Sequence, residues 1–350
     1  MSDRTPVEAA GTASPAPGST RPAPTPWLRS GVVGIALAAL VTVIVLAFSW
    51  PSVTSEPRGI RVAVAGPEQA VTQLEQALSA KADSPLDLST VKDRATAVTE
   101  IEQREVYGAI VLGPKPEVLT ASAASPAVSQ LLTAMSAQLQ AQLAQQAAAN
   151  GTPAPTVTTT DVVPLLDADP RGAGIVAAAF PLVIGGMLGG IAISLSVHGA
   201  RRRALALLVY SAVAGLAVAG VMQGWFGVLA GNYLANAGAF ALSLLAIGAT
   251  IVGAATLVGR VGIAIGPILF LLVANPISSA AAPKEFLPGS WGEAGQWFPP
   301  GAGATLIRNL SYFPDASSTF PWLVLIVWAA GGLLLTTFAG LLHRSRARRA

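Results

Sequence analysis

The stretch AGIVAAAFPLVIGGMLGGIAISLSV, residues 173–197, decides the fold class because its 25 residues include no Asp, Glu, Lys or Arg. A helix needs about 20 apolar residues to cross a bilayer, and this stretch exceeds that length. The same lack of charge recurs in five further stretches: 31–50, 204–224, 234–257, 261–278 and 320–342. The shortest of them is 261–278. The sequence therefore predicts a polytopic α-helical membrane protein with six transmembrane helices.

The distribution of charge predicts how these helices are oriented. If the chain starts inside the cell, its short internal segments carry nine arginines: Arg29, Arg201, Arg202, Arg203, Arg260, Arg344, Arg346, Arg348 and Arg349. The long segment between the first two spans instead carries 8 basic and 13 acidic residues. Because positive charge favours the cytoplasmic side, we expect a multi-pass protein of the cell membrane with both termini cytoplasmic and residues 51–172 extracytoplasmic.

Composition divides the chain further. Residues 1–30 are rich in Pro, Ala, Ser and Thr and predict a disordered cytoplasmic tail. Residues 31–50 form transmembrane helix 1, which we expect to act as a signal anchor and to end at Trp50 and Pro51. The remaining membrane domain is expected to hold five helices over residues 173–342, with an external loop at 279–319 and a basic cytoplasmic tail at 343–350.

The segment between the first two spans predicts a small extracytoplasmic α/β domain. Alternating or β-branched runs predict strands at 60–65, 86–91, 106–112, 117–121 and 156–163. Apolar residues at helical spacing predict helices at 68–81, 93–104 and 126–150. We expect Asp93 to cap the second of these helices and Gly151 to follow the end of the third.

The external loop at 279–319 is rich in proline and aromatic residues, including Trp291 and Trp297. Residues 302–310 within it predict a short helix. Such segments lie at, or dip into, the outer membrane interface, where indole rings are favoured.

Within the predicted membrane domain, glycine pairs recur at four-residue spacing: Gly185 and Gly189, Gly186 and Gly190, Gly220 and Gly224, Gly262 and Gly266. Such pairs let helix backbones approach closely. They predict packing within one bundle, and a subunit interface or a hinge is the alternative. The strongest uncharged polar groups near the spans are Gln223, Asn232, Asn236 and Asn275, which either bond between helices or line a path.

Several kinds of chemistry are excluded or disfavoured. The chain has no cysteine and no phosphate-binding G-x-x-x-x-G-K-[ST] motif, so any ATP must be bound by another chain. Its histidines, His198 and His343, both lie at predicted cytoplasmic helix ends. The spans lack the charged relays typical of ion-coupled transporters. We therefore predict no enzyme activity, no catalytic or metal-binding residue, no cofactor and no nucleic-acid partner in this chain.

Three segments together resemble the ABC-2 type permeases, including their YhgE/Pip-like branch. The first is ATAVTEIEQREVYGAIVL at 95–112 with PEVLTASAAS at 116–125, and the second is DPRGAGIVAAAFPLVIGGMLGG at 169–190. The third is 266–309, where Asn275-Pro276, a Pro-x-x-x-Leu-Pro and a Pro-Pro-Gly precede a short helix, similar to the fifth span and re-entrant elements of that family.

This resemblance implies the permease subunit of an exporter that acts as a homodimer with a separate cytoplasmic ABC ATPase. It also implies an ATPase contact at the turn that holds His198, Arg201, Arg202 and Arg203. The bilayer is the remaining partner.

A second hypothesis is a non-transporting membrane scaffold or envelope-assembly protein whose external domain binds a partner. It is motivated by the Pro-containing segment 22–26, which stands where exporters of this type carry a coupling helix. An external enzyme is a weaker third hypothesis, because neither His nor Cys occurs in the predicted external segments.

Overall fold

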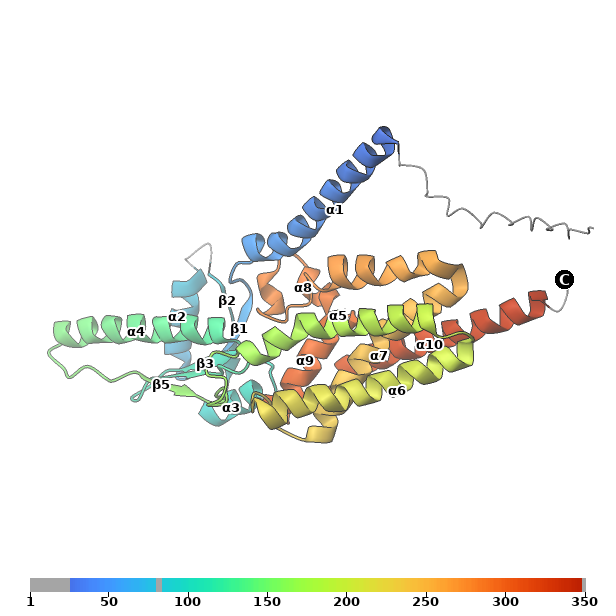
Figure 1. The fold of residues 1–350 in the computed structure, drawn as a ribbon. Helices are drawn as coiled ribbons and strands as arrows, with labels where there is room; N and C mark the ends of the chain where they lie inside the picture. Colours follow the sequence, from blue (N-terminus) through green and yellow to red (C-terminus); the bar gives the residue numbers. More distant parts are fainter. Residues whose placement is uncertain (1–25, 80–83, 348–350) are drawn as a thin grey trace, which may run out of the picture. The chain divides into compact units, whose positions relative to one another are not determined.

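The computed structural model describes residues 26–79 and 84–347 of the chain. The chain divides into two compact units, residues 1–45 and 46–350. In the second unit, a small sheet with its helices lies at one end of a bundle of long helices that run side by side (Figure 1). The expected tail at 1–30 falls almost entirely outside the described residues, as does the end of the tail at 343–350.

Helix α1 (Trp27–Thr54) is apolar and long enough to cross a membrane. It does not end at Trp50 and Pro51 as expected, but continues for three residues beyond Pro51. Proline removes one backbone N–H, so Pro51 costs the helix one internal hydrogen bond but does not end it. The end of the helix contacts the rest of its unit through the edge-to-face ring pairs Phe48–Phe180 and Trp50–Trp291.

The sheet domain has the order of elements that the sequence predicts. Its strands are β1 (Ile60–Ala65), β2 (Leu86–Val91), β3 (Gly108–Val111), β4 (Glu117–Thr120) and β5 (Thr158–Asp161). Its helices are α2 (Glu68–Ser79), α3 (Arg94–Glu102) and α4 (Pro126–Ala149). The strands form one sheet in the order β2-β1-β3-β4-β5, in which only the β3–β4 pair is antiparallel. The carboxylate of Asp93 accepts a hydrogen bond from the Thr96 backbone N–H at 2.8 Å and caps α3 as expected.

The core of the sheet domain includes side chains from a distant part of the chain. Ile60, Leu119 and Leu132 are fully buried between the sheet and its helices. The same cluster contains Phe286 and Phe313, which belong to the predicted external loop. The loop therefore completes the sheet domain's core and is not a separate surface feature.

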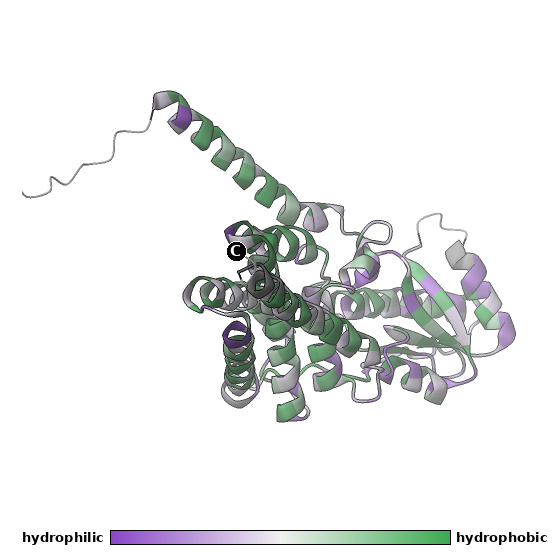
Figure 2. Ribbon diagram, turned by 90° about the vertical axis from the view of Figure 1, so that its right-hand side faces the viewer, coloured by the Kyte–Doolittle hydropathy of each residue, from purple (hydrophilic) through white to green (hydrophobic). Residues whose placement is uncertain are grey.

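The bundle is built from long apolar helices and several irregular helical segments. Its elements are α5 (Ala173–Ser196), α6 (Ala200–Ala219), η1 (Gly220–Trp225), α7 (Tyr233–Val258), η2 (Gly259–Ala264), η3 (Pro267–Ala274), η4 (Lys284–Phe286), α8 (Trp291–Gly295), α9 (Pro299–Tyr312) and α10 (Thr319–Ala347). Hydrophobic residues dominate the bundle, whereas hydrophilic residues concentrate on the sheet domain and at helix ends (Figure 2).

The described residues contain five helical segments that are long and apolar enough to cross a membrane, α1 included. The stretch at 261–278 is not a separate member of this set. Its first residues, 261–264, belong to η2 at the end of the segment Tyr233–Ala264, and the π-helical segment η3 that follows has only 8 residues. The departure from a regular α-helix is explained by Gly259, Gly262 and Pro267. Glycine favours non-helical backbone, and proline removes a helical N–H donor. The six-span arrangement remains a prediction.

Helix α7 occupies the centre of the bundle. Most of its residues are buried, and they are mainly Ala, Gly and Ser. Side chains and backbones of α5, α6, α9 and α10 all approach it closely, as at Gly190, where an added Cβ would lie 3.0 Å from the Cα of Gly248. Small residues along α7 therefore set the spacing of the bundle.

Segment 291–312 dips into the bundle and returns. An added Cβ at Gly303 of α9 would lie 2.7 Å from the Ser243 hydroxyl, roughly 15 Å along α7 from Tyr233 at about 1.5 Å per residue. The Trp297 carbonyl accepts a hydrogen bond from the Trp328 indole N–H at 2.8 Å. This geometry places the turn between α8 and α9 near mid-bundle.

Two adjacent glycines of α10 allow a matched test of this packing. An added Cβ at Gly332 would overlap the backbone of Ala249, whereas Gly331 has open space around it. We expect Gly332→Ala to destabilise the purified protein by about 1–3 kcal/mol, because the two backbones must separate. Thermal unfolding in mild detergent should show a Tm several degrees below wild type.

Gly331→Ala is the control, and it should leave Tm unchanged or slightly higher, because alanine favours the helix. Equal Tm values for the two variants would contradict close contact between α10 and α7.

Candidate functional site

The predicted ATPase-contact loop lies at the α5–α6 turn, where its residues have different roles. His198, Arg201 and Arg202 are exposed. The Arg203 guanidinium instead donates to the Ser194 and Val197 carbonyls, each at 2.8 Å, and to the Thr256 hydroxyl at 3.1 Å. Arg203 therefore joins the ends of α5, α6 and α7, and only the other three side chains are presented outward.

The polar residues that the sequence singled out make contacts between and within helices. Asn236 is fully buried, and its amide donates to the Gln223 side-chain oxygen at 2.9 Å and to the Ala230 carbonyl at 2.8 Å. Asn232 caps α7 through the Ala235 N–H. Asn275 differs from these three, because it follows η3 and lines a cavity of about 260 Å³.

The glycine pairs mostly face neighbouring segments. A Cβ would crowd a neighbour at each of six positions: Gly185, Gly186, Gly189, Gly190, Gly262 and Gly266. Gly220 makes only an ordinary contact with the Tyr233 hydroxyl, and Gly224 has no described neighbour within 4 Å. Close packing inside this bundle therefore does not explain why position 224 is a glycine, because Gly224 lies on the exposed side of η1.

A cavity of about 350 Å³ lies between the sheet domain and the dipping segment. The sheet domain contributes residues 103–107 and Arg61, and the dipping segment contributes Gln296, Thr305 and Arg308. Phe320 and Pro321, at the start of α10, complete one wall. The cavity thus lies where a folded domain meets the end of a membrane helix.

Arg104 enters this cavity from an unusual backbone position. It follows the end of α3 with φ 59°, a left-handed conformation that usually selects glycine after a helix. Its guanidinium donates to the Asn309 side-chain oxygen and lies 5.3 Å from the Phe313 ring centre. Burial lowers the pKa of Arg104.

Arg308 enters from the opposite wall, on α9. Its guanidinium donates to the Ala280 carbonyl at 2.9 Å. Burial, with a smaller contribution from the nearby charge of Arg104, lowers the pKa of Arg308 to about 10. Arginine keeps its charge in proteins, so both residues are cationic at neutral pH.

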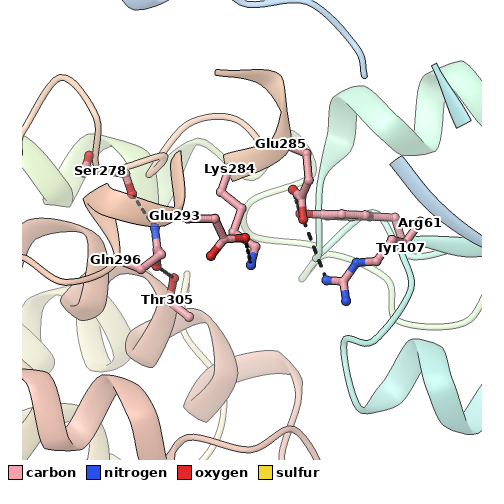
Figure 3. Close-up of polar contacts among 8 residues, drawn as sticks. All are labelled: Arg61, Tyr107, Ser278, Lys284, Glu285, Glu293, Gln296 and Thr305. Atoms are coloured by element: carbon pink, nitrogen blue, oxygen red, sulfur yellow. Dashed lines mark hydrogen bonds and ion pairs between the residues drawn. The ribbon is translucent and has the colours of Figure 1, made fainter. Parts of the chain in front are cut away.

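The carboxylates around the cavity are engaged with other cations or lie at its edge. Glu285 accepts a hydrogen bond from the Tyr107 hydroxyl at 2.7 Å and lies 3.7 Å from the Arg61 guanidinium (Figure 3). Glu293 pairs with Lys284 at 2.6 Å, and Glu105 is exposed. Across the described chain, no carboxylate lies within ion-pair distance of Arg104 or Arg308.

Uncharged polar groups form the deep side of the cavity. The Gln296 amide donates to the Ser278 carbonyl at 3.2 Å and accepts from the Thr305 hydroxyl at 2.6 Å (Figure 3). These bonds fix the turn between α8 and α9. The walls are therefore cationic near the sheet domain and neutral near mid-bundle.

Sequence reasoning did not single out Arg104 or Arg308. Arg308 gave one local signal, because it is the only charge in the otherwise uncharged segment 294–314. Arg104 gave another, because an arginine stands where a helix end favours glycine. Neither signal indicates that the two residues meet.

No family model, curated protein or solved structure matches this chain. Within the described residues, no group of three or more His, Cys, Asp or Glu side chains could hold a metal ion.

The bonds of Arg203 predict a difference between adjacent arginines. Arg203→Ala should lower the Tm of the purified protein, because each lost hydrogen bond to a charged group contributes about 1.5–3 kcal/mol. Arg202→Ala, the control, removes an exposed side chain and should leave Tm within about 1 °C of wild type. Comparable losses of Tm in the two variants would contradict the assignment of Arg203 as the residue that joins the three helix ends.

Proposed function

We propose that this chain is the membrane-spanning permease subunit of an ABC-2 type exporter, energised by a separate cytoplasmic ATPase. The observation that carries the proposal is that the two ends of the second unit differ. The sheet domain occupies one end, and the α5–α6 turn with exposed His198, Arg201 and Arg202 occupies the other. An exposed basic turn at the end remote from a large folded domain fits the cytoplasmic face of a permease.

In this proposal, residues 51–172 are extracytoplasmic and both termini are cytoplasmic. The η2–η3 segment acts as a short, irregular sixth span, which returns the chain to the sheet-bearing end. Irregular backbone at membrane depth is tolerated where protein covers it. One side of η3 is covered in this way, because Phe270 and Ala274 are fully buried, whereas Ile268 is exposed. Broken helices of this kind also occur beside the substrate sites of transporters.

The ATPase would bind the α5–α6 turn and transmit its movement through Arg203. Because Arg203 joins α5, α6 and α7, displacement of the turn would act on three helix ends at once. A homodimer would place two such turns on one face, one for each ATPase. The polar cluster of Gln223 and Asn236 would serve as a helix contact within each subunit.

One observation favours the scaffold hypothesis as the second candidate. Strand β5 is exposed along its whole length and forms an edge of the sheet. An edge strand presents unpaired backbone donors and acceptors that another chain can pair with. A scaffold would use this edge to bind an envelope protein and would need no ATPase.

A double variant separates ATPase contact from bundle stability. Arg201→Ala with Arg202→Ala removes the exposed charges and keeps Arg203. We expect this variant to insert and to keep its Tm, but to capture at least about tenfold less ATPase after in-cell crosslinking and purification from native membranes. Mass spectrometry of the captured proteins measures this ratio.

Arg29→Ala is the control, because it removes another exposed cation at the start of α1. Wild-type protein that captures no ATPase, or a double variant that captures as much as the control, would exclude the proposed contact. Capture of envelope proteins alone would support the scaffold.

A further inference from the structure

We propose that the cavity between the sheet domain and α9 binds a phosphate group through Arg104 and Arg308. This inference does not depend on the proposed exporter function, because it requires neither an ATPase nor transport. The phosphate group could belong to a lipid headgroup or to a soluble molecule, and the experiment below distinguishes the two sources.

The first argument is the number of free donors. A guanidinium carries several N–H groups arranged to meet the oxygens of phosphate or carboxylate. Arg104 uses one nitrogen on Asn309, and Arg308 uses one on Ala280. Both side chains keep part of their surface accessible, and both line the cavity. The remaining donors of the two residues are therefore available to a ligand there.

The second argument is the missing counter-charge. Cations removed from bulk water are normally paired, and leaving one unpaired is costly. No described carboxylate forms an ion pair with either arginine. The charge of Glu285 acts on Arg104 at longer range, but its oxygens are engaged by Tyr107 and Arg61. Glu293 pairs with Lys284, and Glu105 is exposed. Two like charges from opposite walls thus approach one another, and an anion between them would compensate both.

The third argument is the conformation that holds Arg104. A left-handed φ strains any residue with a side chain, and such strain concentrates at functional sites. Glycine would fit this position without strain but could not reach Asn309. The chain therefore accepts strained backbone in order to present a cation.

The size and position of the cavity favour phosphate. A volume of about 350 Å³ lies at the lower end of small-molecule sites, which is larger than an isolated ion requires. Phe320 and Pro321 begin the span of α10, and Trp291, two residues before the cavity residue Glu293, is exposed, as aromatic residues are at membrane interfaces. At that level of a bilayer, phosphate is the characteristic anion.

The test measures binding to the full-length protein purified in neutral detergent. The probes are a short-chain phosphatidylglycerol, the corresponding neutral diacylglycerol and soluble glycerol phosphate. Native mass spectrometry counts bound probe, and calorimetry gives Kd. We expect the phosphate-bearing lipid to bind and the neutral lipid not to bind, with affinity falling at least about tenfold in Arg308→Gln and in Arg104→Gln.

Arg58→Gln is the matched control, because it removes a cation of the same domain that pairs with Glu56 and does not line the cavity. Its affinity should equal that of wild type. Binding of phosphatidylglycerol without glycerol phosphate would identify a lipid headgroup site, and equal binding of both would identify a soluble phosphate ligand.

Unfolding temperature separates a binding role from a structural role. Arg308→Gln relieves repulsion between two cations but loses the guanidinium's bond to the Ala280 carbonyl, so without probe its Tm should stay close to that of wild type. The rise in Tm that the phosphate-bearing probe gives to wild type should be lost. The proposal would be overturned if wild-type protein bound no phosphate-bearing probe. It would also be overturned if the affinity for that probe were equal in Arg308→Gln, Arg104→Gln and Arg58→Gln. The wild-type measurement remains decisive even if the cavity variants fail to fold.

Discussion

The close approach of other helices to α7 is the constraint on which the rest of the structure depends. In a bilayer, lipid is as apolar as the helix faces, so helices associate mainly through tight packing and interhelical hydrogen bonds. Helix α7 meets this requirement with small residues: Gly248 lies against α5 and Gly253 against α10. A larger residue at either position would separate α7 from a neighbouring helix.

The loop at 279–319, which includes the dipping segment, connects the bundle to the sheet domain by contributing to both cores. Phe286 and Phe313 complete the core of the sheet domain, whereas Leu306 and Ile307 are buried against α7 and α10. Each part therefore stabilises the position of the other. The cavity lies at this junction, so its shape depends on the packing of both parts.

Much of the secondary structure could be predicted because it depends on local pattern. The strands and helices of the sheet domain follow alternation, helical spacing and caps such as Asp93, all of which act within a few residues. The structure of the stretch at 261–278 was harder to predict, because the absence of charged residues shows that a segment is apolar but not which type of helix it forms. Gly262 and Pro267 lie in the 3₁₀ and π segments that replace a regular α-helix there, and this helix type could not be predicted from apolarity.

The sequence by itself determined that this is a membrane protein with a small α/β domain, because charge-free stretches and periodic apolar residues are local properties. Only the tertiary structure decided that Arg104 and Asn309, 205 residues apart, bond across a cavity that Arg308 also lines. It also decided that Arg203 joins three helix ends while Arg202 points outward. Such pairings depend on how distant segments pack, and the spacing of residues along the chain does not encode this packing in any local pattern.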